Sequence, residues 1–163
     1  MRMIGPVAAA LVIGACASPL SAPPSAPAPA RPAGPVAELP AQRLHPNDCG
    51  VFLFERRPPN RFVFFEDLSA RTVKILHEGA VLELGVTEQS GALVTGESFR
   101  RVYLDAPNNR TFILTGEVGE DTGSGPRLEA VLLTVQTLDG GRVVRPLGGV
   151  RSCRDGEGGP AAS

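Results

Sequence analysis

Hydrophobic and polar residues alternate along most of the chain after residue 48, in short runs separated by turn residues. Alternation with a period of two is typical of β-strands that bury one face, and no run keeps the spacing of an amphipathic helix. We therefore predict strands over residues 50–55, 61–66, 72–77, 80–87, 92–96, 99–105, 110–118, 127–137 and 142–150.

The pattern inside these runs separates the two faces of each strand. In the run 99–105, Val102 and Leu104 lie on one face and Tyr103 lies on the other. The run 62–65 reads Phe-Val-Phe-Phe and is apolar on both faces. We expect that strand to lie centrally in the sheet.

Short turns join the predicted strands. Glu78-Gly79 and Asp139-Gly140-Gly141 have the composition of tight hairpin turns, because glycine accepts a positive φ without steric cost. About eight short strands joined in this way predict an all-β, antiparallel meander. Closing the meander into a small barrel would remove its exposed edges, and a two-sheet sandwich is the alternative.

The beginning of the chain has a different texture. Met1-Arg2-Met3 is short and positively charged, and 4–13 is an apolar stretch. A stretch of about ten residues is too short to span a bilayer, which needs about 20. It fits the apolar region of a secretory signal, so we predict a signal peptide over residues 1–15.

The residues Ile13-Gly14-Ala15-Cys16 directly follow this stretch. They resemble the lipobox of bacterial lipoproteins, in which an aliphatic residue and two small residues precede the cysteine that receives the lipid. The resemblance implies cleavage before Cys16, acylation of that cysteine and attachment to a membrane. Because Ala17 is not an aspartate, the family rule implies the outer membrane, with the protein facing the periplasm.

Ala15-Cys16-Ala17 also fits the small-x-small pattern of ordinary signal peptidase, and cleavage after Ala17 would release a soluble periplasmic protein. The next segment favours the anchor, because residues 18–46 are rich in proline, alanine and serine. Proline removes amide donors and disfavours helix, so this composition predicts a disordered, extended linker. We assign 16–47 to the lipidated N-terminus and linker, 48–154 to a β domain and 155–163 to a disordered tail.

Two more cysteines, Cys49 and Cys153, flank the predicted domain. An exported protein meets an oxidising compartment, so we predict that they form a disulfide; two free thiols are the alternative. The bridge would close a loop of about 100 residues, worth up to about 4–5 kcal/mol by loop-closure entropy. It would join the first strand to the last, which are neighbours in a barrel.

Charge and motif content argue against several functions. The formal net charge of −1 gives no basic excess for nucleic acid. His45 lies in the linker, and we expect His77 to be a solvated residue at a strand end. No spacing resembles a nucleophile motif or a metal site, so we predict no catalytic residue, no metal, no cofactor and no enzyme activity.

One group of arginines is a candidate binding surface. Arg100 and Arg101 beside Tyr103 are the proposed patch, which would meet anionic lipid headgroups or an acidic protein. The alternative is that these arginines pair with nearby glutamates and aspartates on solvated strand faces. Further arginines that the patch would recruit are Arg56, Arg57 and Arg61.

Cys49 begins a predicted strand, Cys153 ends the domain, and residues 98–103 run from a serine to a tyrosine. In outline this is similar to the membrane-bound inhibitors of C-type lysozyme, which are small lipoproteins with an antiparallel barrel. The resemblance implies a periplasmic binding module. The family's tryptophan and later lysine have no counterparts here, so no inhibitory residue is carried over.

The sequence thus predicts an exported, non-enzymatic lipoprotein held at the membrane by its lipid. Its β domain is expected to bind or support a cell-envelope component, such as an envelope protein or a peptidoglycan-associated partner. A lysozyme-inhibitor-like module and a soluble periplasmic protein are the alternatives.

Overall fold

The structure is a computed structural model that describes residues 36–155. The predicted signal peptide, the lipobox with Cys16, most of the linker and the tail after residue 155 lie outside the described residues, and those assignments stay predictions.

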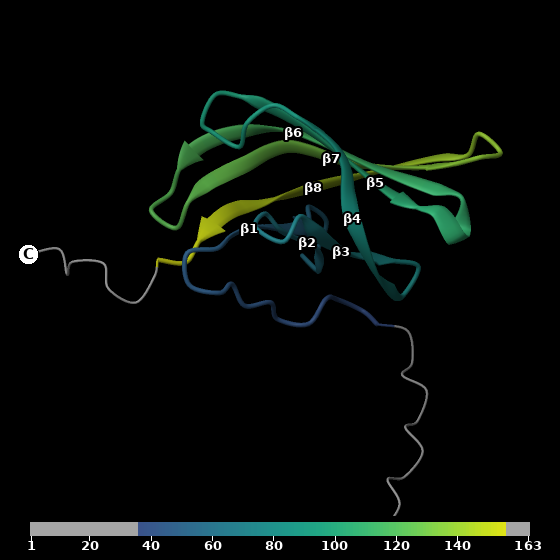
Figure 1. Cartoon of the computed structure of the whole chain (residues 1–163), viewed down its shortest axis with the longest axis horizontal. Coiled ribbons are helices and arrows are strands. Elements are labelled where there is room, and N and C mark those ends of the chain that lie inside the picture. The colour runs from purple at the N-terminus through teal and green to yellow at the C-terminus, as the bar shows by residue number, and fades with distance from the viewer. Residues whose placement is uncertain (1–35, 156–163) are drawn as a thin grey trace, which may run out of the picture. The chain divides into compact units, whose positions relative to one another are not determined.

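Eight antiparallel strands follow one another around a closed barrel (Figure 1). Each strand pairs with the next along the chain, and β1 pairs with β8 to close the barrel. This confirms the antiparallel meander and decides for the barrel over the sandwich. The strands are β1 (Cys49–Glu55), β2 (Phe62–Asp67), β3 (Thr72–His77), β4 (Ala80–Ser90), β5 (Ser98–Asp105), β6 (Arg110–Asp121), β7 (Pro126–Thr137) and β8 (Arg142–Cys153); one 3-10 turn, η1 (Ala106–Asn108), joins β5 to β6.

Large apolar side chains from all around the barrel fill its interior. Phe64 of β2 meets Tyr103 of β5 edge-on across the core, with ring centroids 5.8 Å apart. An eight-stranded barrel is just narrow enough for side chains to fill, so this interior is a packed core. Its fully buried members include Leu53, Phe64, Ile75, Tyr103, Phe112, Leu114, Leu133 and Leu147.

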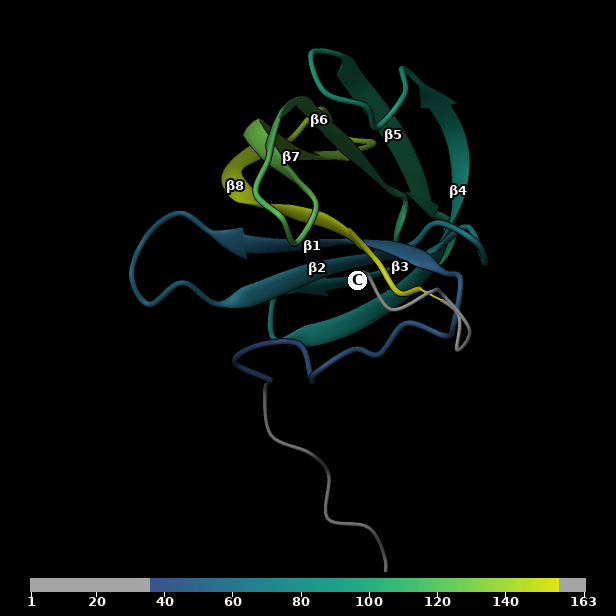
Figure 2. The ribbon, with the colours of Figure 1, turned by 90° about the vertical axis from the view of Figure 1, so that its left-hand side faces the viewer.

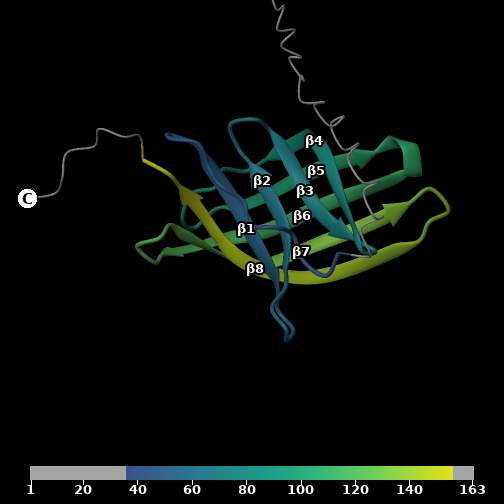
Figure 3. The ribbon, with the colours of Figure 1, turned by 90° about the horizontal axis from the view of Figure 1, so that it is seen from below.

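Residues 36–48, which we call the strap, run along the outside of β1, β2 and β3 (Figure 3). Leu39 and Leu44 of the strap are buried, with 3% and 9% of their surface exposed. The amide of Leu39 donates to the carbonyl of Phe62 at 2.8 Å. The amide of Val36 donates to the carbonyl of Gly79 at 2.9 Å. The strap therefore belongs to the folded unit, and the predicted domain start at residue 48 is wrong.

The strap explains why β2 is apolar on both faces. Phe64 faces the core, and Phe65 faces outward toward the strap. A Cβ built on Gly50 would lie 2.9 Å from Cδ2 of Leu44 and 3.0 Å from Cε2 of Phe65, so these side chains converge over β1. A closed barrel has no central strand, so the expected central position of β2 is wrong. The outer face of β2 is apolar because the strap covers it.

The predicted strand at residues 92–96 is wrong, because this segment is the loop between β4 and β5. Gly91 and Gly96, at either end of it, both have positive φ and turn the chain out of the ladder. A Cβ on Gly91 would lie 2.0 Å from the carbonyl oxygen of Ser98. Leu93 is buried, 8% exposed, against the core instead of standing in a sheet.

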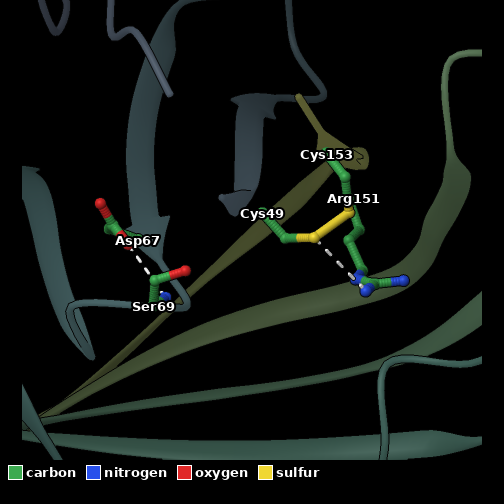
Figure 4. Close-up of a disulfide and its surroundings, with 5 residues drawn as sticks. All are labelled: Cys49, Asp67, Ser69, Arg151 and Cys153. Atoms are coloured by element: carbon green, nitrogen blue, oxygen red, sulfur yellow. Dashed lines mark hydrogen bonds between the residues drawn. A yellow bond between two sulfur atoms is a disulfide. The ribbon is translucent and has the colours of Figure 1, made fainter. Parts of the chain in front are cut away.

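The ladder between β1 and β8 closes the barrel, as the view in Figure 2 shows from one side. Its register runs from Cys49 opposite Cys153 to Glu55 opposite Leu147. The two cysteines form the predicted disulfide, with Cα atoms 4.0 Å apart and a separation of 104 positions in the sequence (Figure 4). The ladder continues past the bridge, where the amide of Arg154 donates to the carbonyl of Asp48 at 2.9 Å.

Close contact between β1 and β8 requires glycine at position 149. A Cβ there would lie 1.8 Å from the carbonyl oxygen of Phe52 in β1, and a backbone atom cannot move aside as a flexible side chain can. Gly85 in β4 is the matched contrast, because a Cβ at that position would meet nothing within 4 Å.

We therefore expect Gly149→Ala to destabilise the protein by more than about 3 kcal/mol, or to prevent folding, because the closing strands must separate. Gly85→Ala is expected to change stability by less than about 1 kcal/mol. Urea denaturation followed by circular dichroism measures both values. Equal stabilities of the two variants would contradict the close contact.

Candidate functional site: an arginine-lined pocket where the barrel closes

A pocket of about 440 Å³ lies at the end of the β1–β8 ladder that is opposite the disulfide. One wall comes from the end of β1 and the loop to β2, which extends beyond the barrel in Figures 2 and 3. The other wall comes from β8. The lining residues are Glu55, Arg56, Arg57, Pro58, Pro59, Arg61, Val144, Arg145 and Pro146.

Glu55 holds two of the four arginines in place. Its Oε1 atom lies 2.6 Å from Nη2 of Arg145, and its Oε2 atom lies 2.7 Å from Nη2 of Arg61. Partial burial alone would raise the pKa of Glu55, but the hydrogen bonds from Arg145 and Arg61 outweigh it and keep that pKa below its usual value. Glu55 is therefore an anchor for guanidinium groups at neutral pH.

Arg56 is fixed by the backbone of the opposite wall. Its Nε atom donates to the carbonyl of Leu147 at 2.9 Å. A Cβ at Gly148 would lie 3.2 Å from that Nε atom, so the guanidinium passes close over the glycine. Among residues 36–155, the Nη atoms of Arg56 and the whole guanidinium of Arg57 have no hydrogen-bond or ion-pair partner.

A second charged cluster lies beside the pocket at the same end of the barrel. Arg110 donates to Asp105 at 2.7 Å through Nη2, and the imidazole of His77 meets the ring of Phe112 edge-on. The side chain of His77 is only 12% exposed, so the expected solvated histidine is wrong. Burial lowers the pKa of His77, and the positive charges of Arg110 and Arg145 lower it further. The carboxylate of Glu78 opposes this shift but does not outweigh it.

The three residues of the predicted patch do not share a surface. Arg100 lies on the outside of β5 and pairs with Glu88 at 3.1 Å, whereas Arg101 and Tyr103 point into the barrel and are 6% and 0% exposed. The alternative, pairing with acidic residues on solvated strand faces, holds for Arg100 but not for Arg101, whose acidic partner Glu66 is buried. Alternation along β5 separates its two faces correctly, but it is the face with Tyr103 that turns inward, and Leu104 is half exposed.

Arg101 and Tyr103 meet a buried carboxylate inside the barrel. The hydroxyl of Tyr103 donates to Oε2 of Glu66 at 3.1 Å, and Nε of Arg101 lies 3.7 Å from Oε1. Burial raises the pKa of Glu66, although Arg101 and Tyr103 both oppose that shift. Arg101 also donates through Nη1 to the carbonyls of Ser90 and Gly91, which ties the β4–β5 loop to the core.

Comparison with protein-family models, with curated proteins and with solved structures finds no match to this chain. Among residues 36–155 there is no helix long and apolar enough to cross a bilayer, and no group of three or more metal-ligating side chains.

The arginines of the pocket were visible in the sequence only in part. Arg56, Arg57 and Arg61 stand close together along the chain, but Arg145 is 90 residues away from Glu55. Only the register of β1 on β8 brings Arg145 to the site. The positions of the charged residues along the sequence do not reveal how β1 and β8 are aligned, so they do not predict that Arg145 joins the site.

The buried carboxylate gives a test of the interior network. Arg101→Met leaves the charge of Glu66 unpaired, and we expect a loss of about 3–5 kcal/mol in unfolding free energy at pH 7. Because the folded-state pKa of Glu66 lies above its ordinary value of 4.5, the contribution of Glu66 to stability is greatest below pH 4.5 and is lost as pH rises through the folded-state pKa. The loss should therefore be smaller at pH 4 and grow by at most about 1.4 kcal/mol per pH unit.

The control is Glu66→Gln/Arg101→Met, which keeps an acceptor for the hydroxyl of Tyr103 and removes the charge. We expect this double variant to be more stable than the single one at pH 7, with no growth of the deficit above pH 4. Urea denaturation across that pH range measures both. A double variant no more stable than the single one would show that Glu66 is not the cause.

Proposed function

We propose that this protein is an exported, lipid-anchored protein without catalytic activity, whose barrel binds or supports another component of the cell envelope. The disulfide carries most weight, because stable disulfides belong to oxidising compartments. The chain has three cysteines, and the bridge uses two of them. Cys16 is left for the lipid that its lipobox-like surroundings favour.

The filled interior of the barrel supports binding through the outside of the domain. Leu53, Phe112 and Leu133 are 0% exposed and occupy the space that an internal ligand would need. The arginine-lined pocket is then the natural place for an interaction, since its volume is in the range of ligand sites.

The chemistry of the pocket favours binding over catalysis. A general acid or base works best with a pKa near the operating pH. Glu55 is the only carboxylate that lines the pocket, and its lowered pKa leaves it ionised and hydrogen-bonded to two arginines. Guanidinium groups remain charged at all ordinary pH values, so they attract anions without exchanging protons.

Inhibition of a C-type lysozyme is the alternative function. The closed antiparallel barrel, with its first and last strands joined by a disulfide, favours it. Burial of Tyr103 counts against it, because the stretch 98–103 then presents no exposed tyrosine. An assay of lysozyme activity in the presence of the purified protein decides this alternative, and inhibition at stoichiometric concentrations would support it.

The mass of the mature protein isolated from membranes tests the proposed anchor. We expect a chain that begins at Cys16 and carries acyl groups, and we expect Cys16→Ala to leave the membrane fraction. A mature chain that begins at Ser18 without lipid would overturn the anchor and favour the soluble periplasmic alternative.

A further inference from the structure

We propose that the arginine-lined pocket is a binding site for a phosphate monoester carried on a small apolar or ring-shaped body. This inference rests on the binding role proposed above, but it does not depend on the lipid anchor.

The charge of the pocket is the first argument. Its lining holds four guanidinium groups and a single carboxylate, that of Glu55; the guanidinium groups belong to Arg56, Arg57, Arg61 and Arg145. Both oxygens of that carboxylate are already taken by Arg61 and Arg145. The remaining positive charge has no counter-ion among the described residues, so the pocket attracts an anion with several oxygens.

The rigidity of two arginines is the second argument. Arg145 is held on both sides, by Glu55 and by the carbonyl of Leu76, which accepts from its Nη1 atom at 2.9 Å. Arg56 is held through its Nε atom by the carbonyl of Leu147. Donors that are fixed before a ligand arrives lose little side-chain freedom when it binds.

The apolar walls of the pocket indicate what the part of the ligand outside its anionic group is made of. Pro58 and Pro59 line one side, and Val144 and Pro146 line the other. Val144 is 45% exposed, and Leu132, the partner of Pro146 in β7, is 41% exposed, so the apolar surface continues outward from the pocket. A bare inorganic ion would make no contact with these apolar side chains, so we expect the ligand to carry an apolar body.

A phosphate monoester fits these features better than a carboxylate. It carries about −1.5 to −2 charges at neutral pH and three terminal oxygens, so one group can accept from several guanidinium donors. A pocket of about 440 Å³ has room for the phosphate and a ring-sized body. The same chemistry occurs in soluble phosphate esters and in phosphorylated lipid headgroups.

Phenyl phosphate is the probe for the site, with inorganic phosphate and benzoate as partial ligands. Calorimetric titration uses the exported protein in whichever mature form is isolated. We expect phenyl phosphate to bind at least about tenfold more tightly than either partial ligand, because only it uses both the guanidinium groups and the apolar walls. Binding of phenyl phosphate no tighter than that of inorganic phosphate would overturn the proposal.

Matched variants locate the binding. Arg56→Gln/Arg57→Gln should weaken phenyl phosphate binding by about tenfold or more, because charge-assisted hydrogen bonds are lost. Arg71→Gln/Arg127→Gln removes the same charge from exposed positions that do not line the pocket and should leave the affinity unchanged. Arg57→Gln alone keeps the bond from Arg56 to Leu147 and should still weaken binding. Equal losses in both double variants would overturn the site.

Vesicles of phosphatidylcholine with phosphatidic acid identify the source of the ligand. Binding to these vesicles that falls in Arg56→Gln/Arg57→Gln assigns the site to a lipid headgroup. Binding of phenyl phosphate without vesicle binding assigns it to a soluble ester, and both results support the site. Because the mass of the mature protein is measured separately, a failed anchor and a failed pocket are distinguishable.

Discussion

The pairing of β1 with β8 is the constraint on which the rest of the structure depends. Without it the meander would have two exposed edges, each with a row of unpaired amides and carbonyls. Gly149 lets the strands approach, and the disulfide between Cys49 and Cys153 makes the contact covalent at one end. The strap then covers the outer face that β1 shares with β2 and β3.

The closing ladder also builds the candidate site at its other end. Glu55 stands at the end of β1 and Arg145 stands in β8, so their ion pair exists only when the two strands are in register. The backbone of β8 likewise holds Arg56 through the carbonyl of Leu147. The disulfide and the pocket thus occupy opposite ends of one ladder, and a change of register would dismantle both.

Much of this fold could be predicted from the sequence, because alternation along β4 and β6 is strong and two cysteines flank the domain. The exceptions have physical reasons. Leu39 and Leu44 are isolated among polar residues and prolines, so nothing in their pattern reveals that they cover β2. Alternation separates the faces of β5 without saying which turns inward. The pairing of Arg101 with Glu66 is buried, which overturns the expectation of an exposed patch at Arg101 and Tyr103. The pocket was missed because it depends on register.

Amide hydrogen exchange of the oxidised protein tests the role of closure most directly. If the barrel depends on the β1–β8 ladder, the hydrogen-bonded amides of these two strands should exchange as slowly as the slowest amides of β6 and β7, because all of them open only with global unfolding. The contradicting result is exchange in β1 and β8 at least about tenfold faster than in β6 and β7. The ladder would then open locally while the remaining barrel stays folded. In that case the rest of the fold would not depend on the pairing of β1 with β8.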